Sequence, residues 1–123
     1  LVSTLIKYDT SGCYKSFPPD EEMFAFCGIA EPDSFINSAL ELGLKIKGRR
    51  LFKDHQNYTR AIIKELSEQI RSNSSNHVVT TEKDMVKLPD SFIVEFNVYA
   101  IKIEVIFENE LIINDIIQAI LLK

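Results

Sequence analysis

The sequence lacks the short motifs that most often reveal a nucleotide or metal site. It has no glycine-rich dinucleotide fingerprint and no G-x-x-x-x-G-K-[ST] loop of the kind that cradles nucleotide phosphates. Its two cysteines, Cys13 and Cys27, fit neither a zinc nor a redox spacing. No set of His, Cys, Asp and Glu residues has a metal-ligand spacing either. We therefore expect no metal site and no phosphate-binding loop within these 123 residues.

An excess of basic charge and long apolar runs are missing as well. The 14 basic and 18 acidic residues give a formal charge of −4 at pH 7, whereas a nucleic-acid-binding domain is usually basic. No apolar run approaches the ~20 residues that cross a bilayer. A length of 123 residues predicts one domain, large enough to bury a core without disulfides. We therefore expect a globular domain without a nucleic-acid partner.

What the chain does contain is an alternation of apolar strands and helical segments. The expected strands are 2–8, 23–27, 44–52, 77–80 and 96–107, and residues 9–20 are expected to form a loop. The expected helices follow Pro32, follow Thr59, cover 84–88 as a single turn, and cover the apolar segment 111–122. This order predicts an α/β fold of three layers, with a mainly parallel sheet and helices on both faces, as in Rossmann-like domains.

Local signals mark the ends of two of these helices. Pro32 suits a first helical turn, and Gly43 is placed to end that helix in the left-handed conformation. Thr59 can cap the next helix, and Tyr58 and Ile63 stand at the positions of a hydrophobic staple. Both helices are therefore predicted from their caps as well as from their apolar periodicity.

A polar cluster follows three of the expected strands, at 28–32, 54–59 and 80–84. The carboxyl ends of parallel strands lie at one edge of a sheet, and ligands bind along that edge. We therefore expect the three clusters to meet in space and to look into one opening. Gly28 is expected to provide a turn that other residues would resist.

Two of the clusters contain groups that could carry chemistry. In the first, Asp54 precedes His55, and a carboxylate near an imidazole can raise its basicity and so favour a general base. The alternative is an ordinary surface histidine. In the second, Thr80, Thr81, Glu82 and Lys83 open a helix, where hydroxyls, a cation and free N–H groups can hold phosphate oxygens. The alternative is a plain helix cap, with Thr81 as the capping residue.

Together, three stretches resemble the C-terminal part of the tetraacyldisaccharide 4′-kinase family, the lipid A 4′-kinases of Gram-negative bacteria. The matching stretches are 26–35 (FCGIAEPDSF), 52–59 (FKDHQNYT) and 79–88 (VTTEKDMVKL), and the resemblance covers roughly residues 23–103. The last stretch is the most specific of the three, and the glycine turn is weak alone. Gln56 departs from the family, which often has a second histidine there.

The resemblance implies a function and a place in a larger protein. The family transfers the γ-phosphate of ATP to the 4′-hydroxyl of a tetraacyldisaccharide 1-phosphate, at the cytoplasmic side of the bacterial inner membrane. ATP and Mg²⁺ would be bound mainly by an N-terminal P-loop lobe. The chain begins at Leu1 rather than Met, so we expect a fragment of a longer protein. Because the fragment lacks the P-loop, we expect it to bind no cofactor and to be inactive alone, and we expect it to be soluble. Residues 1–20 would be a strand and linker from the preceding lobe, and 21–123 the C-terminal α/β domain.

The resemblance also implies residue roles. His55 would partner a catalytic aspartate from the preceding lobe and help activate the sugar hydroxyl, with Asp54 and Tyr58 positioning it. Thr80, Thr81, Glu82 and Lys83, the family's TTEKD run, would face the cleft between the lobes together with Gly28. Their expected partners there are the nucleotide, the glycolipid headgroup or only each other.

Two other functions stay open at the level of the sequence. Asp-His pairs also occur in metal-dependent phosphoesterases, although that chemistry needs more ligands than His55 and His77 can supply. A non-enzymatic module that binds a nucleotide or a partner is the second alternative, since fold alone does not exclude it.

Overall fold

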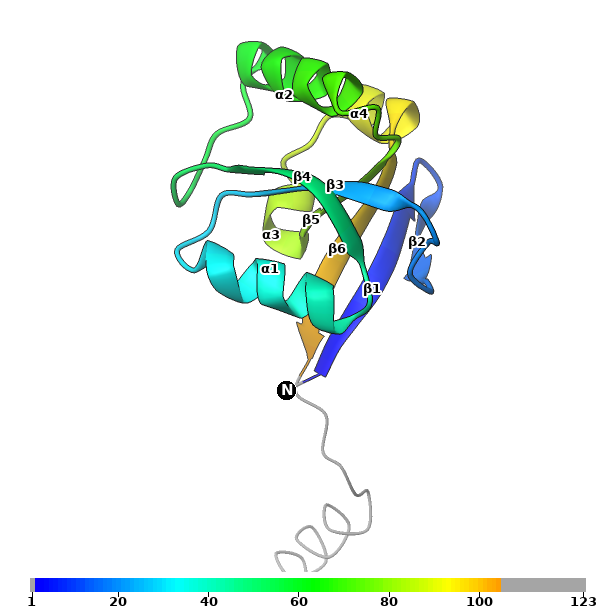
Figure 1. Ribbon diagram of the computed structural model, residues 1–123. Helices are drawn as coiled ribbons and strands as arrows, with labels where there is room; N and C mark the ends of the chain where they lie inside the picture. The colour runs from blue at the N-terminus through cyan, green and yellow to red at the C-terminus, as the bar shows by residue number, and fades with distance from the viewer. Residues whose placement is uncertain (1, 105–123) are drawn as a thin grey trace, which may run out of the picture.

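The computed structural model describes residues 2–104, which form one six-stranded sheet with helices on both of its faces (Figure 1). The elements in chain order are β1 (Val2–Asp9), β2 (Gly12–Lys15), β3 (Glu22–Cys27), α1 (Pro32–Glu41), β4 (Lys45–Leu51), α2 (Arg60–Ser72), β5 (His77–Thr81), α3 (Glu82–Met85), α4 (Asp90–Glu95) and β6 (Asn97–Glu104). The strand order across the sheet is β2-β1-β6-β5-β3-β4. The predicted α/β architecture is confirmed.

Four neighbouring strands, β6, β5, β3 and β4, run parallel to one another. The remaining two, β1 and β2, extend the sheet beyond β6 through antiparallel pairing. β5 pairs with β6 and with β3, and β3 pairs with β4, all in parallel. β1 pairs antiparallel with β6, and β2 pairs antiparallel with β1. The carboxyl ends of β3, β4, β5 and β6 therefore lie at one edge. After β3 the chain moves outward to β4 and then returns past β3 to β5, which makes the ends of β3 and β5 a topological switch point.

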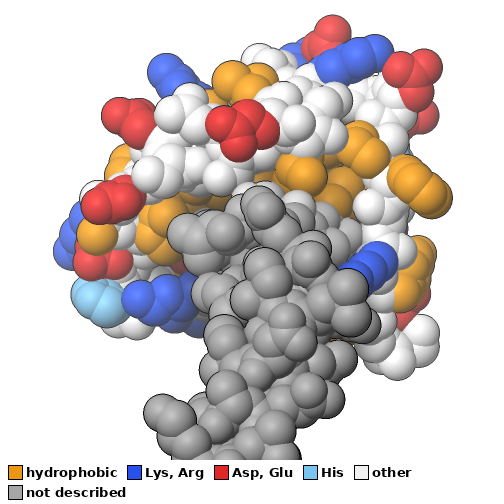
Figure 2. All heavy atoms as spheres, turned by 90° about the horizontal axis from the view of Figure 1, so that it is seen from below, with side chains coloured by type: hydrophobic (Ala, Val, Ile, Leu, Met, Phe, Trp, Pro, Cys, Tyr) orange, Lys and Arg blue, Asp and Glu red, His pale blue; other side chains and the backbone are white. Residues whose placement is uncertain are grey.

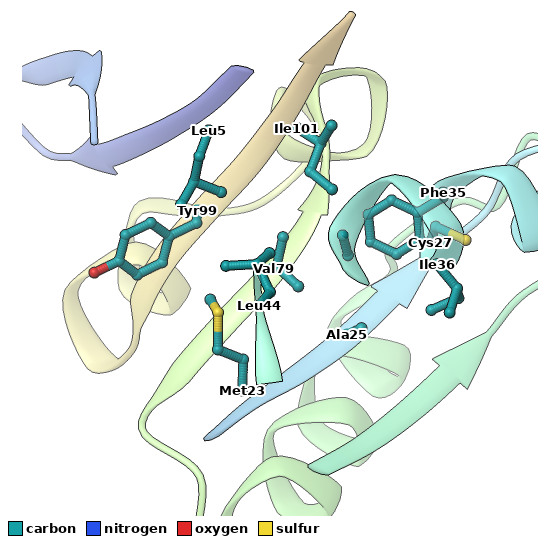
Figure 3. Packing of buried hydrophobic residues seen from close by; sticks show 11 residues of the cluster. Leu5, Met23, Ala25, Cys27, Phe35, Ile36, Leu44, Val79, Tyr99 and Ile101 are labelled. Atoms are coloured by element: carbon teal, nitrogen blue, oxygen red, sulfur yellow. The ribbon is translucent and has the colours of Figure 1, made fainter. Parts of the chain in front are cut away.

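The residues of β3 divide between two hydrophobic clusters, because successive side chains of a strand point to opposite faces. Met23, Ala25 and Cys27 pack in the cluster beneath α1, which Figure 3 shows together with Phe35 and Ile36 of that helix. Phe24 and Phe26 pack in the second cluster, with residues of α2, α3 and α4. A strand covered on both faces is apolar throughout, and this explains the unbroken run that the sequence shows here.

The helix caps follow the sequence signals closely. The Thr59 hydroxyl accepts a hydrogen bond from the Ile62 N–H at 3.3 Å, and Gly43 has a φ of 86° beyond the end of α1. α3 begins two residues earlier than the expected 84–88 turn, because the Thr81 hydroxyl accepts the Asp84 N–H at 3.1 Å and caps the helix there. Thr59 and Thr81 were thus identified correctly as capping residues, whereas the expected bounds 84–88 were wrong at both ends, since α3 ends at Met85.

Two elements differ from the expectations. Residues 9–20 are not wholly a loop, because β2 forms a hairpin with β1 in which Asp9 faces Gly12. The Asp9 carboxylate closes its turn by accepting the Ser11 N–H at 2.8 Å and the Ser11 hydroxyl at 2.6 Å. All four residues of β2 are exposed, so this strand shows no alternation of apolar and polar residues. α4 was not expected either, since a six-residue helix is too short to show periodicity.

Two expectations extend past the described residues. The strand expected at 96–107 is present as β6 up to Glu104, and its remainder lies outside the described residues. The apolar helix expected at 111–122 also lies outside them. Between residues 2 and 104, no helix has both the length and the apolar character needed to cross a membrane. On the face seen in Figure 2, acidic and basic side chains are interspersed among hydrophobic ones.

The two cysteines should differ sharply in reactivity. Cys27 is buried, and burial together with the nearby Asp84 raises the pKa of its thiol to about 11. At pH 8 roughly one such thiol in a thousand is ionised, and the thiolate is the reactive form. Iodoacetamide should therefore label the exposed Cys13 in the native protein and reach Cys27 only in denaturant, as mass spectrometry of the tryptic peptides would show. Equal labelling of both thiols in the native state would contradict this burial.

Candidate functional site

The carboxyl group of Asp84 joins the three polar clusters at the carboxyl edge of the sheet. It accepts the Gly28 N–H at 3.1 Å on both oxygens, the Tyr58 hydroxyl at 2.9 Å and the Thr81 hydroxyl at 2.6 Å. Its side chain is buried, with the residue 1% exposed. The expectation that the three clusters meet in space is confirmed, and a buried side chain from α3 makes the contact.

Tyr58 is held firmly in this group. Its ring packs edge-on against Phe26 and Phe52, with centroid distances of 5.8 and 5.6 Å. Burial raises the pKa of the Tyr58 phenol, and the charge and hydrogen bond of Asp84 raise it further. The hydroxyl therefore stays protonated and acts as a donor to Asp84. In this position Tyr58 fixes the segment that begins α2 relative to α3.

His55 combines a constrained backbone with an exposed side chain. Its φ is 60°, in the left-handed region, which a non-glycine residue adopts at some cost and which is frequent at functional sites. Its N–H donates to the Gly28 carbonyl at 3.1 Å and to the Asp54 carboxylate at 3.0 Å. The imidazole is 74% exposed, and its Nε2 lies 3.5 Å from Asp54 Oδ2. The imidazole is thus accessible from outside the domain and lies beside a carboxylate.

Gly28 is required for close approach rather than for an unusual turn. Its φ lies outside the left-handed region, in contrast to Gly12 and Gly43. A Cβ built on Gly28 would lie 2.7 Å from Gln56 Cβ and 3.1 Å from the Lys53 carbonyl oxygen. The expectation of a glycine-only turn is therefore corrected: the β4–α2 loop passes so close that no side chain fits.

The remaining predicted residues fall into separate environments. Thr80 is fully buried within β5, and its hydroxyl has no hydrogen-bond partner among the described residues. Glu82 is half-buried and Lys83 is exposed. A pocket of about 240 Å³ lies beside α1, lined by Ile29, Glu31, Ser34, Phe35, Ser38, Thr81, Lys83 and Ile101. The clusters 28–32 and 80–84 therefore share this pocket, whereas no residue of 54–59, His55 included, lines it. The expectation of one opening for all three clusters is wrong for this pocket.

Comparison with known proteins identifies the family. The sequence model of the family described as "Tetraacyldisaccharide-1-P 4'-kinase" matches residues 7–121. The chain belongs to this family. The chain is 34% identical over 100 residues to the tetraacyldisaccharide 4'-kinase of Desulfotalea psychrophila, a match that covers 76% of the chain and 28% of the relative. With the enzyme of that name from Rickettsia canadensis it shares 32% identity over 92 residues, covering 75% of the chain and 27% of the relative.

A solved structure supports the same assignment. The "apo" form of LpxK from Aquifex aeolicus in complex with ATP resembles the chain with a TM-score of 0.55 and 28% identity, over 82% of the chain and 28% of that protein. The chain therefore spans little more than a quarter of the length of these tetraacyldisaccharide 4'-kinases.

In this member of the tetraacyldisaccharide 4'-kinase family, sequence reasoning missed the central role of Asp84. An acid at this position suits the helix dipole in any first helical turn and so signals no further role. The spacing of Thr81 and Asp84 does predict that both stand at a helix start, as in a capping box. It does not reveal that the Asp84 side chain turns inward to Gly28 and Tyr58.

The residues available for a metal ion are few. Within residues 2–104, no group of three His, Cys, Asp or Glu side chains is placed to hold one. The metal-dependent phosphoesterase considered from the sequence would need such a group. The described residues therefore offer no set that fits Mg²⁺, and no chemical step is assigned to a metal held by this chain.

Proposed function

We propose that this chain is the C-terminal domain of an ATP-dependent kinase that phosphorylates the 4′-hydroxyl of tetraacyldisaccharide 1-phosphate in lipid A biosynthesis. Family membership supports the reaction. The observation in this chain that supports a catalytic role for the site is the exposed imidazole of His55 on its constrained backbone. Residues 21–123 would form the domain, and residues 1–20 would lead into it from a preceding P-loop lobe that binds ATP and Mg²⁺. The whole protein would act at the cytoplasmic face of the inner membrane.

His55 assists the attack of the sugar hydroxyl in this proposal. Phosphoryl transfer depends mainly on positioning and on stabilisation of developing charge, and two lobes that close on their substrates can supply groups from both sides. His55 partners a carboxylate from the preceding lobe, which takes the proton of the 4′-hydroxyl as the γ-phosphate is transferred. Asp54, whose Oδ2 lies 3.5 Å from the imidazole Nε2, orients the ring.

The residues beside α1 complete the proposed site. Thr81 and Lys83 line the pocket of about 240 Å³, and the exposed ammonium of Lys83 can approach phosphate oxygens of the nucleotide or of the glycolipid. Gly28 and Tyr58 support this edge from within through their hydrogen bonds to Asp84, and the buried Thr80 and half-buried Glu82 flank Thr81 in the chain. The cation at the pocket rim and the imidazole at the same edge of the sheet would both face the preceding lobe across a cleft.

The proposal is tested by comparing the isolated chain with the whole protein. We expect the intact protein to transfer radiolabel from [γ-³²P]ATP to tetraacyldisaccharide 1-phosphate, and the isolated 123-residue chain to show no turnover of either substrate. Circular dichroism of the isolated chain serves as the control that it is folded. Turnover by the folded chain alone would contradict the proposal, and an intact protein that binds nucleotide without transferring phosphate would support a non-enzymatic module instead.

A further inference from the structure

Two hydrogen bonds connect the carboxyl group of Asp84 to the backbone of His55 through a single residue. The Gly28 N–H donates to both Asp84 oxygens at 3.1 Å, and the Gly28 carbonyl accepts the His55 N–H at 3.1 Å. Because the N–H and the carbonyl belong to the same glycine, a shift of the Asp84 carboxyl group moves the acceptor of His55. The link acts through the His55 backbone and involves no contact with its imidazole.

The segment after His55 is tied to the same part of the chain. The Tyr58 hydroxyl donates to Asp84 at 2.9 Å, and the Lys87 ammonium donates to the Gln56 carbonyl at 3.2 Å. Residues 84–87 therefore restrain both the backbone of His55, through Gly28, and the residues that follow it up to Tyr58. A left-handed φ of 60° at His55 persists only when its surroundings hold it, and these contacts supply that restraint.

Helix capping alone does not explain why the Asp84 side chain is an acid that points into the protein. The Thr81 hydroxyl caps α3 by accepting the backbone N–H of residue 84, a contact that any amino acid but proline would allow at that position. An exposed acid would serve the helix dipole equally well, as Asp90 shows in the first turn of α4. Burying a carboxyl group is costly unless hydrogen bonds satisfy it, and at Asp84 three neighbouring donors do so.

We propose that Asp84 is a positioning residue, which holds Gly28 and Tyr58 together and so fixes the backbone of His55 in the conformation that presents its imidazole to substrate. The inference rests on the proposed function in one respect, since the substrate is that of the kinase. The link from Asp84 to His55 is a property of the fold and can be tested without catalysis.

The test compares Asp84→Asn with Asp90→Asn in the intact kinase. Asparagine keeps the size of the side chain but replaces one acceptor oxygen by an NH₂ donor, so it cannot accept all three donors. Asp90→Asn likewise removes an acid from the first turn of a short helix, at an exposed residue outside the site. Tyr58→Phe removes one contact to Asp84 and serves as a second variant should Asp84→Asn fold poorly.

Two readouts are needed. The first is the amide resonance of His55 in protein labelled with ¹⁵N-histidine, assigned by its loss in His55→Gln. The second is kcat and KM for ATP, measured well below the thermal midpoint of each variant. We expect Asp84→Asn to move the His55 resonance and to lower kcat roughly tenfold with an unchanged KM, since a misplacement of 1 Å can cost about 10²-fold and the remaining contacts of the loop limit the shift. Tyr58→Phe should act in the same direction to a smaller extent, and Asp90→Asn should leave both readouts unchanged.

The outcomes separate this inference from the proposed function. A His55 resonance that stays in place in both Asp84→Asn and Tyr58→Phe overturns the positioning role, whatever the kinase assay shows. A resonance that moves while kcat is unchanged supports the link and overturns the role of His55 in the reaction. A fall in kcat that only follows the loss of folded protein, with no shift of His55, overturns the positioning role in favour of a structural one.

Discussion

His55→Ala should lower the kcat of the intact kinase roughly 10²–10⁴-fold, the range that general acid–base assistance contributes. Its thermal midpoint should stay within about 2 °C of the parent, since the imidazole is 74% exposed and its loss removes little packing. Histidine tolerates a φ of 60° better than alanine does, so part of any small fall in the midpoint would reflect the backbone at this residue. The measurement is initial-rate kinetics with saturating ATP, paired with a thermal scan.

His77 offers a matched control, because it is the other of the two histidines in the chain. It lies at the amino end of β5, its side chain is 14% exposed, and its Nε2 pairs with the Glu21 carboxylate. His77→Ala should therefore lower the thermal midpoint and leave kcat nearly unchanged, the reverse of His55→Ala. If His55→Ala lowered stability as His77→Ala does, or left kcat intact, His55 would be a structural residue.

Gly28→Ala, which adds a single methyl group, should lower both the stability of the domain and the activity of the intact kinase. The new Cβ would lie 2.7 Å from Gln56 Cβ and 3.1 Å from the Lys53 carbonyl, and neither atom is at the free end of a side chain. Adding a methyl group to a packed region typically costs about 1–3 kcal/mol. We expect urea denaturation to show a loss of that size, and kcat to fall as well, because the displaced loop carries His55.

Ala30→Ser provides the comparison for this substitution. It adds one atom in the same turn, at an exposed residue, and should change the free energy of unfolding by less than about 0.5 kcal/mol. If Gly28→Ala were as mild as Ala30→Ser, the β4–α2 loop would have room that the structure does not show. Glycine would then not be required at this position.

The parts of the fold that were predicted correctly have strong local signals. The apolar run 23–27 predicts a strand buried on both faces, and Thr59 and Gly43 mark helix ends through groups within a few residues. β2 and α4 were missed because they are short and, in the case of β2, fully exposed. The pairing of β2 with β1 stabilises it, and that information lies in neither segment alone.

The chain's own sequence determined the α/β class, the strands whose ends carry polar residues, and the gathering of those residues at one edge. The alternation of strands and helices along the chain and the polarity of each segment are local properties. Only the tertiary structure decided how the edge is built: that Asp84 points inward and joins Gly28, Tyr58 and Thr81, that Gly28 is needed for closeness rather than for its φ, and that Thr80 is buried. These features depend on contacts between residues up to 56 positions apart, such as Gly28 and Asp84, and therefore on packing that no single segment encodes.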